Sequence, residues 1–190
     1  MVQESAEKSN SRRLSLAEWM QQESIADLEN SVALIWPPGL EDAVELYQNG
    51  ADAVHVSGPE DPVTAAMVPN HDGVKYIESE SHELREEHEG RYDIEIGWAV
   101  GSDLERTVNT GKTVEEAVDK ILKTSDNILK DNGTAIHNLN NTDKNSLDID
   151  NQAEAAELFE EALEPDRNVR VYQDHELPNQ NTYVAWKNEC

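Results

Sequence analysis

Cysteine, basic residues and long apolar runs are scarce in this chain of 190 residues, and each scarcity excludes a class of protein. The one cysteine, Cys190, is the last residue, so neither an internal disulfide nor a cysteine-based metal site can form. No apolar run approaches the length of a membrane span, and residues 1–13 lack the apolar core of a secretory signal. The sequence therefore predicts a cytoplasmic protein that does not insert into membranes.

Lysine and arginine together number 15, against 40 aspartates and glutamates, which gives a net charge of −25. A surface with this charge repels nucleic acids and anionic lipids, so we expect no nucleic-acid partner. The acids are spread from Glu4 to Glu189 instead of forming one block. This spread favours an acidic protein adapted to high salt, as in a halophilic archaeon, over a protein that acts on a basic partner.

Familiar catalytic motifs are also missing from the sequence. It contains no Gly-x-Ser-x-Gly elbow, no phosphate-binding loop and no Cys–His nucleophile pair. His82 and His88 are six residues apart, which is not the four-residue spacing of a helical zinc site, so no metal is predicted. His137 lies at the end of a predicted strand, where α/β sheets place their ligands, and is a candidate general base for a hydroxyl substrate. The alternative is a histidine that only makes local hydrogen bonds.

Hydrophobic periodicity divides the chain into a disordered polar tail (1–13) and one α/β domain (14–190). Residues 15–28 have helical spacing, and Ser15 with Glu18 forms a capping-box signature. The last two strands alternate in polarity, which predicts an antiparallel pair at a sheet edge. Further helices are predicted over 40–49, 82–89, 113–129 and 153–163, with a brief turn over 61–67, and strands over 31–36, 53–56, 74–77, 92–100, 134–139, 169–172 and 182–186.

Two segments resemble known sequence patterns. Residues 92–100 read Tyr-Asp-Ile-Glu-Ile-Gly-Trp-Ala-Val, and residues 128–134 read Ile-Leu-Lys-Asp-Asn-Gly-Thr. Together with the element order over 31–186, they resemble the fourth strand and the following glycine turn of class I S-adenosylmethionine-dependent methyltransferases. The resemblance implies a three-layer Rossmann-like sandwich, with a mixed seven-strand sheet that ends in an antiparallel hairpin, and S-adenosylmethionine as cofactor.

The same resemblance implies a set of cofactor-binding residues. Glu80, just past the third strand, matches the acidic position that contacts the adenine amino group in that family. Trp36 and Gly39 flank the loop for the methionine part of the cofactor, and Ser57 ends the strand beside the ribose. Trp98 is placed to stack on adenine or to line a substrate pocket. For both tryptophans the alternative is core or rim packing.

The chain departs from the family pattern at two of these places. The first loop reads Trp36-Pro37-Pro38-Gly39, which keeps one glycine and lacks two backbone donors. The second strand ends in Ser57 where the family carries Asp or Glu. Each change weakens cofactor binding by about 1–3 kcal/mol, or ~100-fold together.

Two functional hypotheses follow from these observations. One is a methyltransferase that acts on a small-molecule or sugar acceptor. The other is an inactive relative that serves as a binding or regulatory partner of another protein. Residues 50–56 also resemble a strand of phosphate-binding (β/α) barrels. However, the chain is shorter than the roughly 200 residues of such barrels, and its terminal hairpin does not suit one.

Overall fold

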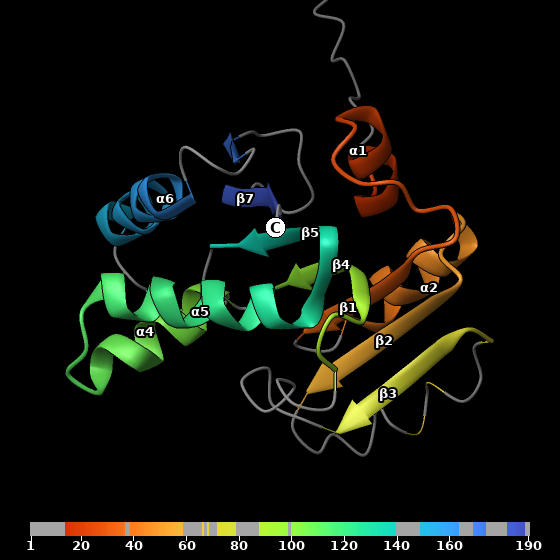
Figure 1. Ribbon diagram of the computed structural model, residues 1–190, viewed down its shortest axis with the longest axis horizontal. Coiled ribbons are helices and arrows are strands. Elements are labelled where there is room, and N and C mark those ends of the chain that lie inside the picture. The colour runs from red at the N-terminus through yellow and green to blue at the C-terminus, as the bar shows by residue number, and fades with distance from the viewer. Residues whose placement is uncertain are drawn as a thin grey trace, which may run out of the picture.

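The computed structural model describes residues 14–36, 39–58, 66, 68, 72–78, 88–98, 100–139, 149–163, 169–173 and 182–188, with the backbone alone at 101–103, 105–106 and 149–154. Figure 1 shows helices lying on both sides of a central sheet. The elements are α1 (Leu16–Gln22), β1 (Val32–Trp36), α2 (Leu40–Gln48), β2 (Ala53–Gly58), β3 (Val74–Glu78), β4 (Tyr92–Gly97), α4 (Val100–Asn109), α5 (Val114–Ile128), β5 (Leu129–Asn138), α6 (Ile149–Leu163), β6 (Arg170–Gln173) and β7 (Thr182–Lys187).

All seven strands form one sheet in the order β3-β2-β1-β4-β5-β7-β6. The first five strands are parallel to one another, and β7 runs antiparallel to both β5 and β6. The predicted mixed seven-strand sheet with a C-terminal antiparallel hairpin is therefore confirmed. The chain moves outward from β1 to β3 and then returns to place β4 on the other side of β1. Ligands of such sheets bind at the carboxyl ends of the strands beside this switch point.

Successive side chains of the central strands point to opposite faces of the sheet, and this divides the core into two layers. Ala33 and Ile35 of β1 face α1 and α2, whereas Leu34 and Trp36 face the layer of α4, α5 and α6 (Figure 1). This alternation suits a parallel sheet, which needs helices on both faces to exclude water from its apolar side chains. No helix of the described residues is long and apolar enough to cross a bilayer.

Side-chain caps fix the starts of two helices. The capping box of Ser15 and Glu18 is present at α1 as predicted, and Thr113 with Glu116 forms a second one at α5. The helix α1 ends at Gln22, earlier than predicted, and Ser24 then adopts a left-handed backbone with φ 52°. The predicted inward residues Ile25 and Leu28 are still buried, in the segment that follows the helix.

Three sequence predictions need correction. The strand predicted over 92–100 ends at Gly97, and the helix α4, which was not predicted, begins at Val100. The predicted glycine turn lies inside β5. Tyr92 pairs with Leu129 and Ile94 with Thr134, so two steps along β4 match five along β5. The chain bulges there. Finally, α6 begins at Ile149, and Ala162, which was predicted to face inward, is exposed.

Several sequence predictions lie outside the described residues. They are the tail 1–13, most of the turn predicted over 61–67, Glu80, residues 82–87 of a predicted helix, residues 140–148 of a loop predicted over 140–150, and a turn predicted at Pro178-Asn179 between the last two strands. The last two residues of that predicted loop instead belong to α6.

Candidate functional site

The carboxyl ends of β1 and β4 meet at the switch point of the sheet. The strand β1 ends at Trp36, and α2 begins after its N-cap, Gly39. The strand β4 ends at Gly97, and the backbone N–H of Trp98 donates a 2.7 Å hydrogen bond to the Trp36 carbonyl oxygen. This bond joins the two strand ends and places the Trp98 side chain beside the start of α2.

Gly39, Asp42 and Trp98 form a group at this edge, which we call the edge cluster. A Cβ atom built on Gly39 would lie 2.9 Å from Asp42 Oδ2 and 3.3 Å from Trp98 Nε1. The indole Nε1 is buried and donates to no described residue. The Trp98 ring itself packs edge-on against Tyr183 of β7, with centroids 6.0 Å apart. A carboxylate and an indole N–H therefore both approach the Gly39 backbone closely, which is possible because residue 39 has no side chain.

Asp42 is the charged member of the edge cluster. Burial, together with the neighbouring carboxylates of Glu45 and then Glu41, raises the pKa of Asp42 from 3.8 to about 6. No described cation pairs with this carboxylate. A carboxylate with a strongly raised pKa at a ligand-binding edge is a candidate functional group. The sequence analysis missed Asp42 because an acid in the first turn of a helix is common for electrostatic reasons alone.

Trp36 points into the opposite layer, toward α4 and α5. Its side chain is 5% exposed, and its Nε1 donates a 2.7 Å hydrogen bond to Oε1 of the fully buried Glu95. The structure therefore places Trp36 in the core, which was the alternative to walling a cofactor pocket. The Trp36 carbonyl oxygen nevertheless lies at the carboxyl edge of the sheet, where it accepts the hydrogen bond from the Trp98 backbone N–H.

His137 lies in the same buried group. Its Nε2 is 3.4 Å from Glu95 Oε1 and 3.5 Å from Ser125 Oγ, and its ring packs edge-on against Trp186 with centroids 4.7 Å apart. The side chain is 0% exposed. Because a general base must reach the proton that it removes, this position is closed to a bound acceptor. The catalytic role of His137 stays a prediction. In the structure its side chain makes only local contacts within the core.

The nucleoside side of the predicted site lies at the ends of β2 and β3. Ser57 is 0% exposed, so its hydroxyl does not face solvent at this edge. Gly58 follows it and pairs with Glu78, the exposed last residue of β3. Glu78 is therefore an exposed carboxylate at the predicted ribose corner of the sheet. The predicted adenine contact, Glu80, lies outside the described residues.

A second buried polar group lies near the start of β4, away from the carboxyl edge. Tyr92 Oη is 2.9 Å from His55 Nδ1 and 3.2 Å from His88 Nδ1. Burial, followed by the positive charge of Arg91, lowers the pKa of His55 to about 4, so its ring is neutral at physiological pH. Burial also raises the pKa of Tyr92 to about 12. His55 and Tyr92 are therefore uncharged, hydrogen-bonded members of the core.

Two hollows lined by described residues also lie away from the carboxyl edge. One, of about 530 Å³, lies between α5 and α6, with Val118, Leu122 and Leu158 on its floor and several carboxylates around it. The other, of about 60 Å³, lies at the amino end of β6 and the carboxyl end of β7, beside Thr134 of β5. Among the residues that the structure describes, no group of three or more His, Cys, Asp and Glu could hold a metal ion.

Comparisons with known proteins identify the fold. No protein-family model and no curated protein matches the chain. Among solved structures, the "putative rRNA-methylase" of Clostridium thermocellum has a TM-score of 0.64 at 12% identity, over 94% of this chain and 98% of that one. The 1,6-didemethyltoxoflavin-N1-methyltransferase of Burkholderia thailandensis, solved with S-adenosylhomocysteine, has a TM-score of 0.60 at 13% identity, over 96% and 80%.

A third structure supports the same assignment. The TehB-like S-adenosylmethionine-dependent methyltransferase of Corynebacterium glutamicum has a TM-score of 0.58 at 12% identity, over 92% of this chain and 88% of that one. At such identities these likenesses show the fold alone. The chain has the Rossmann-like fold of class I S-adenosylmethionine-dependent methyltransferases, as the sequence resemblance implied.

Proposed function

We propose that this chain binds S-adenosylmethionine at the carboxyl edge of its sheet and transfers the methyl group to a small-molecule or sugar acceptor. The observation that carries the proposal is the edge cluster. At the switch point of this fold, Asp42 and the buried Trp98 Nε1 both lie against the Gly39 backbone, and neither polar group has a partner among the described residues. An unpaired carboxylate and a buried unpaired donor both lower their free energy by binding a complementary ligand.

The edge cluster fits the amino-acid end of the cofactor. The Asp42 carboxylate complements an ammonium group, and the Trp98 N–H, with the backbone N–H groups that begin α2, complements a carboxylate. At the other end, Glu78 beside Gly58 is placed to accept hydrogen bonds from ribose hydroxyls, in the role predicted for Ser57. Glu80 remains our proposed adenine contact.

The remaining residues of the site align and support the ligands. A sulfonium cofactor supplies an activated methyl group, so a methyltransferase needs alignment more than an acid–base pair. The bond between the Trp36 carbonyl and Trp98 N–H holds the two strand ends in register. The contact of Glu95 with the Trp36 indole fixes β1 from the core side. The net charge of −25 favours a small or sugar acceptor over nucleic acid.

A specific observation also favours the second candidate, a non-catalytic protein that serves a protein partner. Pro37 and Pro38 remove two backbone donors from the cofactor loop, and Ser57 is buried where the family carries an exposed acid. The two candidates differ in whether the cofactor binds.

Calorimetry with S-adenosylmethionine in molar KCl distinguishes the two candidates. We expect binding in the micromolar range if the protein is a methyltransferase. Adenosine, which lacks the amino-acid end, should bind at least ~10-fold more weakly, because it leaves Asp42 unpaired. No heat with millimolar S-adenosylmethionine would favour the scaffold. Equal affinities for the two ligands would exclude the edge cluster as the amino-acid site.

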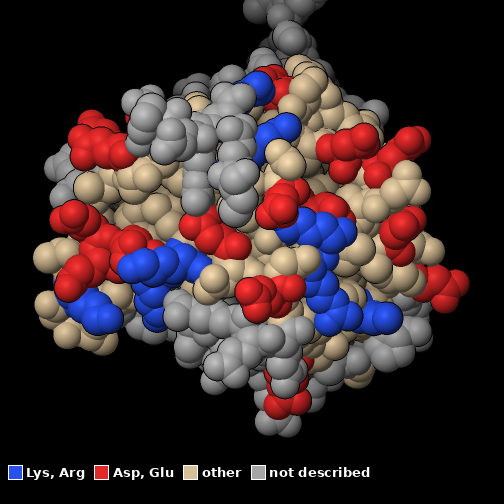
Figure 2. Space-filling model, viewed as in Figure 1, with Lys and Arg blue, Asp and Glu red and all other residues tan. Residues whose placement is uncertain are grey.

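We also propose that the acidic surface is an adaptation to high salt in a cytoplasmic protein of a halophile. Figure 2 shows Asp and Glu side chains distributed over the visible face instead of gathered in one patch. Because the like charges repel one another, the melting temperature should rise by several degrees between dilute and molar KCl. Circular dichroism melts measure this shift. A melting temperature indifferent to salt would contradict the proposal.

A further inference from the structure

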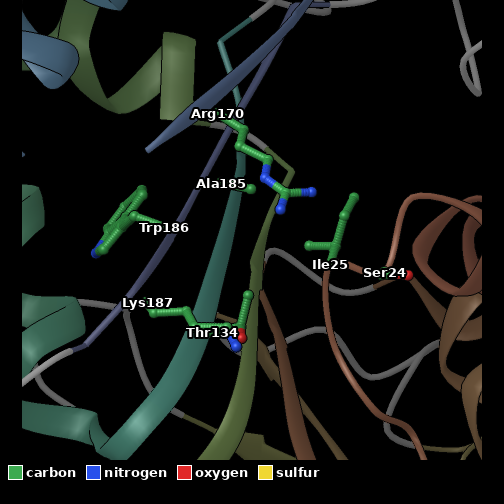
Figure 3. Close-up of a pocket in the computed structure, with 7 residues that line it drawn as sticks. All are labelled: Ser24, Ile25, Thr134, Arg170, Ala185, Trp186 and Lys187. Carbon is green, nitrogen blue, oxygen red and sulfur yellow. The ribbon is translucent and has the colours of Figure 1, made fainter. Parts of the chain in front are cut away.

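A small pocket on the amino-terminal side of the sheet contains two basic side chains in this strongly acidic protein. Arg170 begins β6, and Lys187 ends β7. Figure 3 shows them with Thr134 and with Ser24 and Ile25 of the segment after α1, whereas the Trp186 ring points away. We call this the amino-edge pocket. Its lining is completed by Ala185, and none of its lining residues is Asp or Glu.

Strand register explains why the two cations lie together. Thr134 of β5 pairs with Lys187, and Ala185 pairs with Arg170. Because alternate residues of a strand share a face, the side chains of residues 185 and 187 lie on the same side of the sheet, roughly 7 Å apart. That side is the α1 side, where Ala185 belongs to the core. The pairing therefore places Arg170, Lys187 and Thr134 at neighbouring positions on one face of the sheet.

Local contacts position the donors of the pocket. Arg170 Nη1 donates a 3.0 Å hydrogen bond to the Glu23 carbonyl oxygen, which holds the guanidinium over the segment after α1. That bond takes one of the five N–H donors of the group. Among the described residues, neither Arg170 nor Lys187 forms an ion pair with a carboxylate, in contrast to Lys130, which is bound to Asp93. The Glu23 carboxylate nevertheless lies near enough for its charge to act on the Arg170 guanidinium. Thr134 is 5% exposed and lines the same hollow.

We infer that the amino-edge pocket binds a tetrahedral oxyanion such as phosphate. The volume of about 60 Å³ compares with roughly 10–15 Å³ for one water, so it admits the four oxygens of such an ion. Arginine and lysine supply charge-assisted donors, and the hydroxyls of Ser24 and Thr134 add neutral ones. The site is distinct from the proposed cofactor site, because it lies at the opposite ends of the parallel strands.

Titration of the full chain with inorganic phosphate in KCl tests this inference by calorimetry, with ionic strength held constant. We expect binding in the millimolar range, weakened about ten-fold by Arg170→Gln or Lys187→Gln and several-fold by Thr134→Val. The matched control is Lys112→Gln, an exposed lysine outside the pocket that changes the net charge equally. Far-UV circular dichroism verifies that each variant is folded.

The outcomes separate a specific site from a general charge effect. Weakening by Lys187→Gln but not by Lys112→Gln supports the pocket. Equal weakening by both variants, or no phosphate binding to the unchanged protein, overturns it. Glycerol phosphate distinguishes the source of the anion. Affinity comparable with that of inorganic phosphate indicates that the site accepts the phosphate group of a larger molecule. If inorganic phosphate binds and glycerol phosphate does not, the natural ligand of the site is a free inorganic ion.

Discussion

Replacing Asp42 by asparagine should stabilise the ligand-free protein at neutral pH and weaken cofactor binding. The raised pKa, about 6 against 3.8, corresponds to up to about 3 kcal/mol for a fully buried group. Partial exposure reduces this to about 1–2 kcal/mol. The favourable interaction of Asp42 with the start of α2 offsets roughly 0.3–1 kcal/mol of it. We therefore expect Asp42→Asn to raise the free energy of unfolding by about 1 kcal/mol, measured by denaturant titration in molar KCl.

The stability gain should depend on pH in a defined direction. The folded-state pKa of Asp42 is raised, so between pH 3.8 and about 6 the folded protein holds a proton that the unfolded chain has lost. Stability from this group therefore falls as pH rises through that window and stays low above it. The difference between Asp42→Asn and the unchanged protein should grow from about pH 4 to about pH 6 and then level off.

Asp42→Asn should raise stability but lower the affinity for the cofactor. Loss of a charge-assisted hydrogen bond to an ammonium group weakens affinity by about 10-fold to 100-fold. Near pH 6, where Asp42 is half protonated, cofactor binding should also release a proton, which calorimetry in buffers of different ionisation enthalpy detects. Asp52→Asn, which removes an exposed acid that does not contribute to the raised pKa of Asp42, should change neither property. If both variants bind the cofactor equally well, the edge cluster is not the amino-acid site.

The fold could be predicted from the sequence because its signals are local and periodic. The run over residues 32–36 is apolar on both faces, as a central parallel strand must be, and the alternation over 182–187 indicated the antiparallel edge. The helix α4 escaped prediction because only Leu104 and a few other apolar residues mark it, directly after a strand of similar polarity. The bulge in β5 depends on pairing with β4, which no local pattern reveals.

The candidate site was less accessible to prediction, because side-chain direction depends on tertiary packing. Trp36 and Trp98 both lie near the carboxyl end of a predicted strand, yet the structure turns the Trp36 side chain into the core and the Trp98 side chain toward α2. Asp42 becomes distinctive only when burial and two neighbouring acids raise its pKa. Glu78 gains its place from pairing with Gly58, two strands from the switch point. These are long-range relations that the residue types alone do not encode.

Replacing Trp36 by phenylalanine should produce the largest loss of stability. Phenylalanine keeps an aromatic ring in the core but removes the 2.7 Å hydrogen bond to Glu95, whose side chain is 0% exposed and whose Oε2 has no partner among the described residues. His137 Nε2, 3.4 Å from Oε1, is then the one described group left beside that oxygen, and loss of a buried hydrogen bond destabilises a protein by about 1–3 kcal/mol. We expect about 2 kcal/mol, or a fall of roughly 4–8 °C in melting temperature at this chain length.

Trp186 provides a matched control for this replacement. It lies in the same core layer and is 1% exposed, but its Nε1 donates to no described residue. Trp186→Phe therefore removes the same atoms without breaking a hydrogen bond and should lower stability by about 1 kcal/mol or less. Adding Glu95→Gln to Trp36→Phe replaces the buried acid that has lost its donor and should recover part of the loss. Equal losses for the two tryptophans, with no recovery in the double variant, would show that ring packing alone accounts for the role of Trp36.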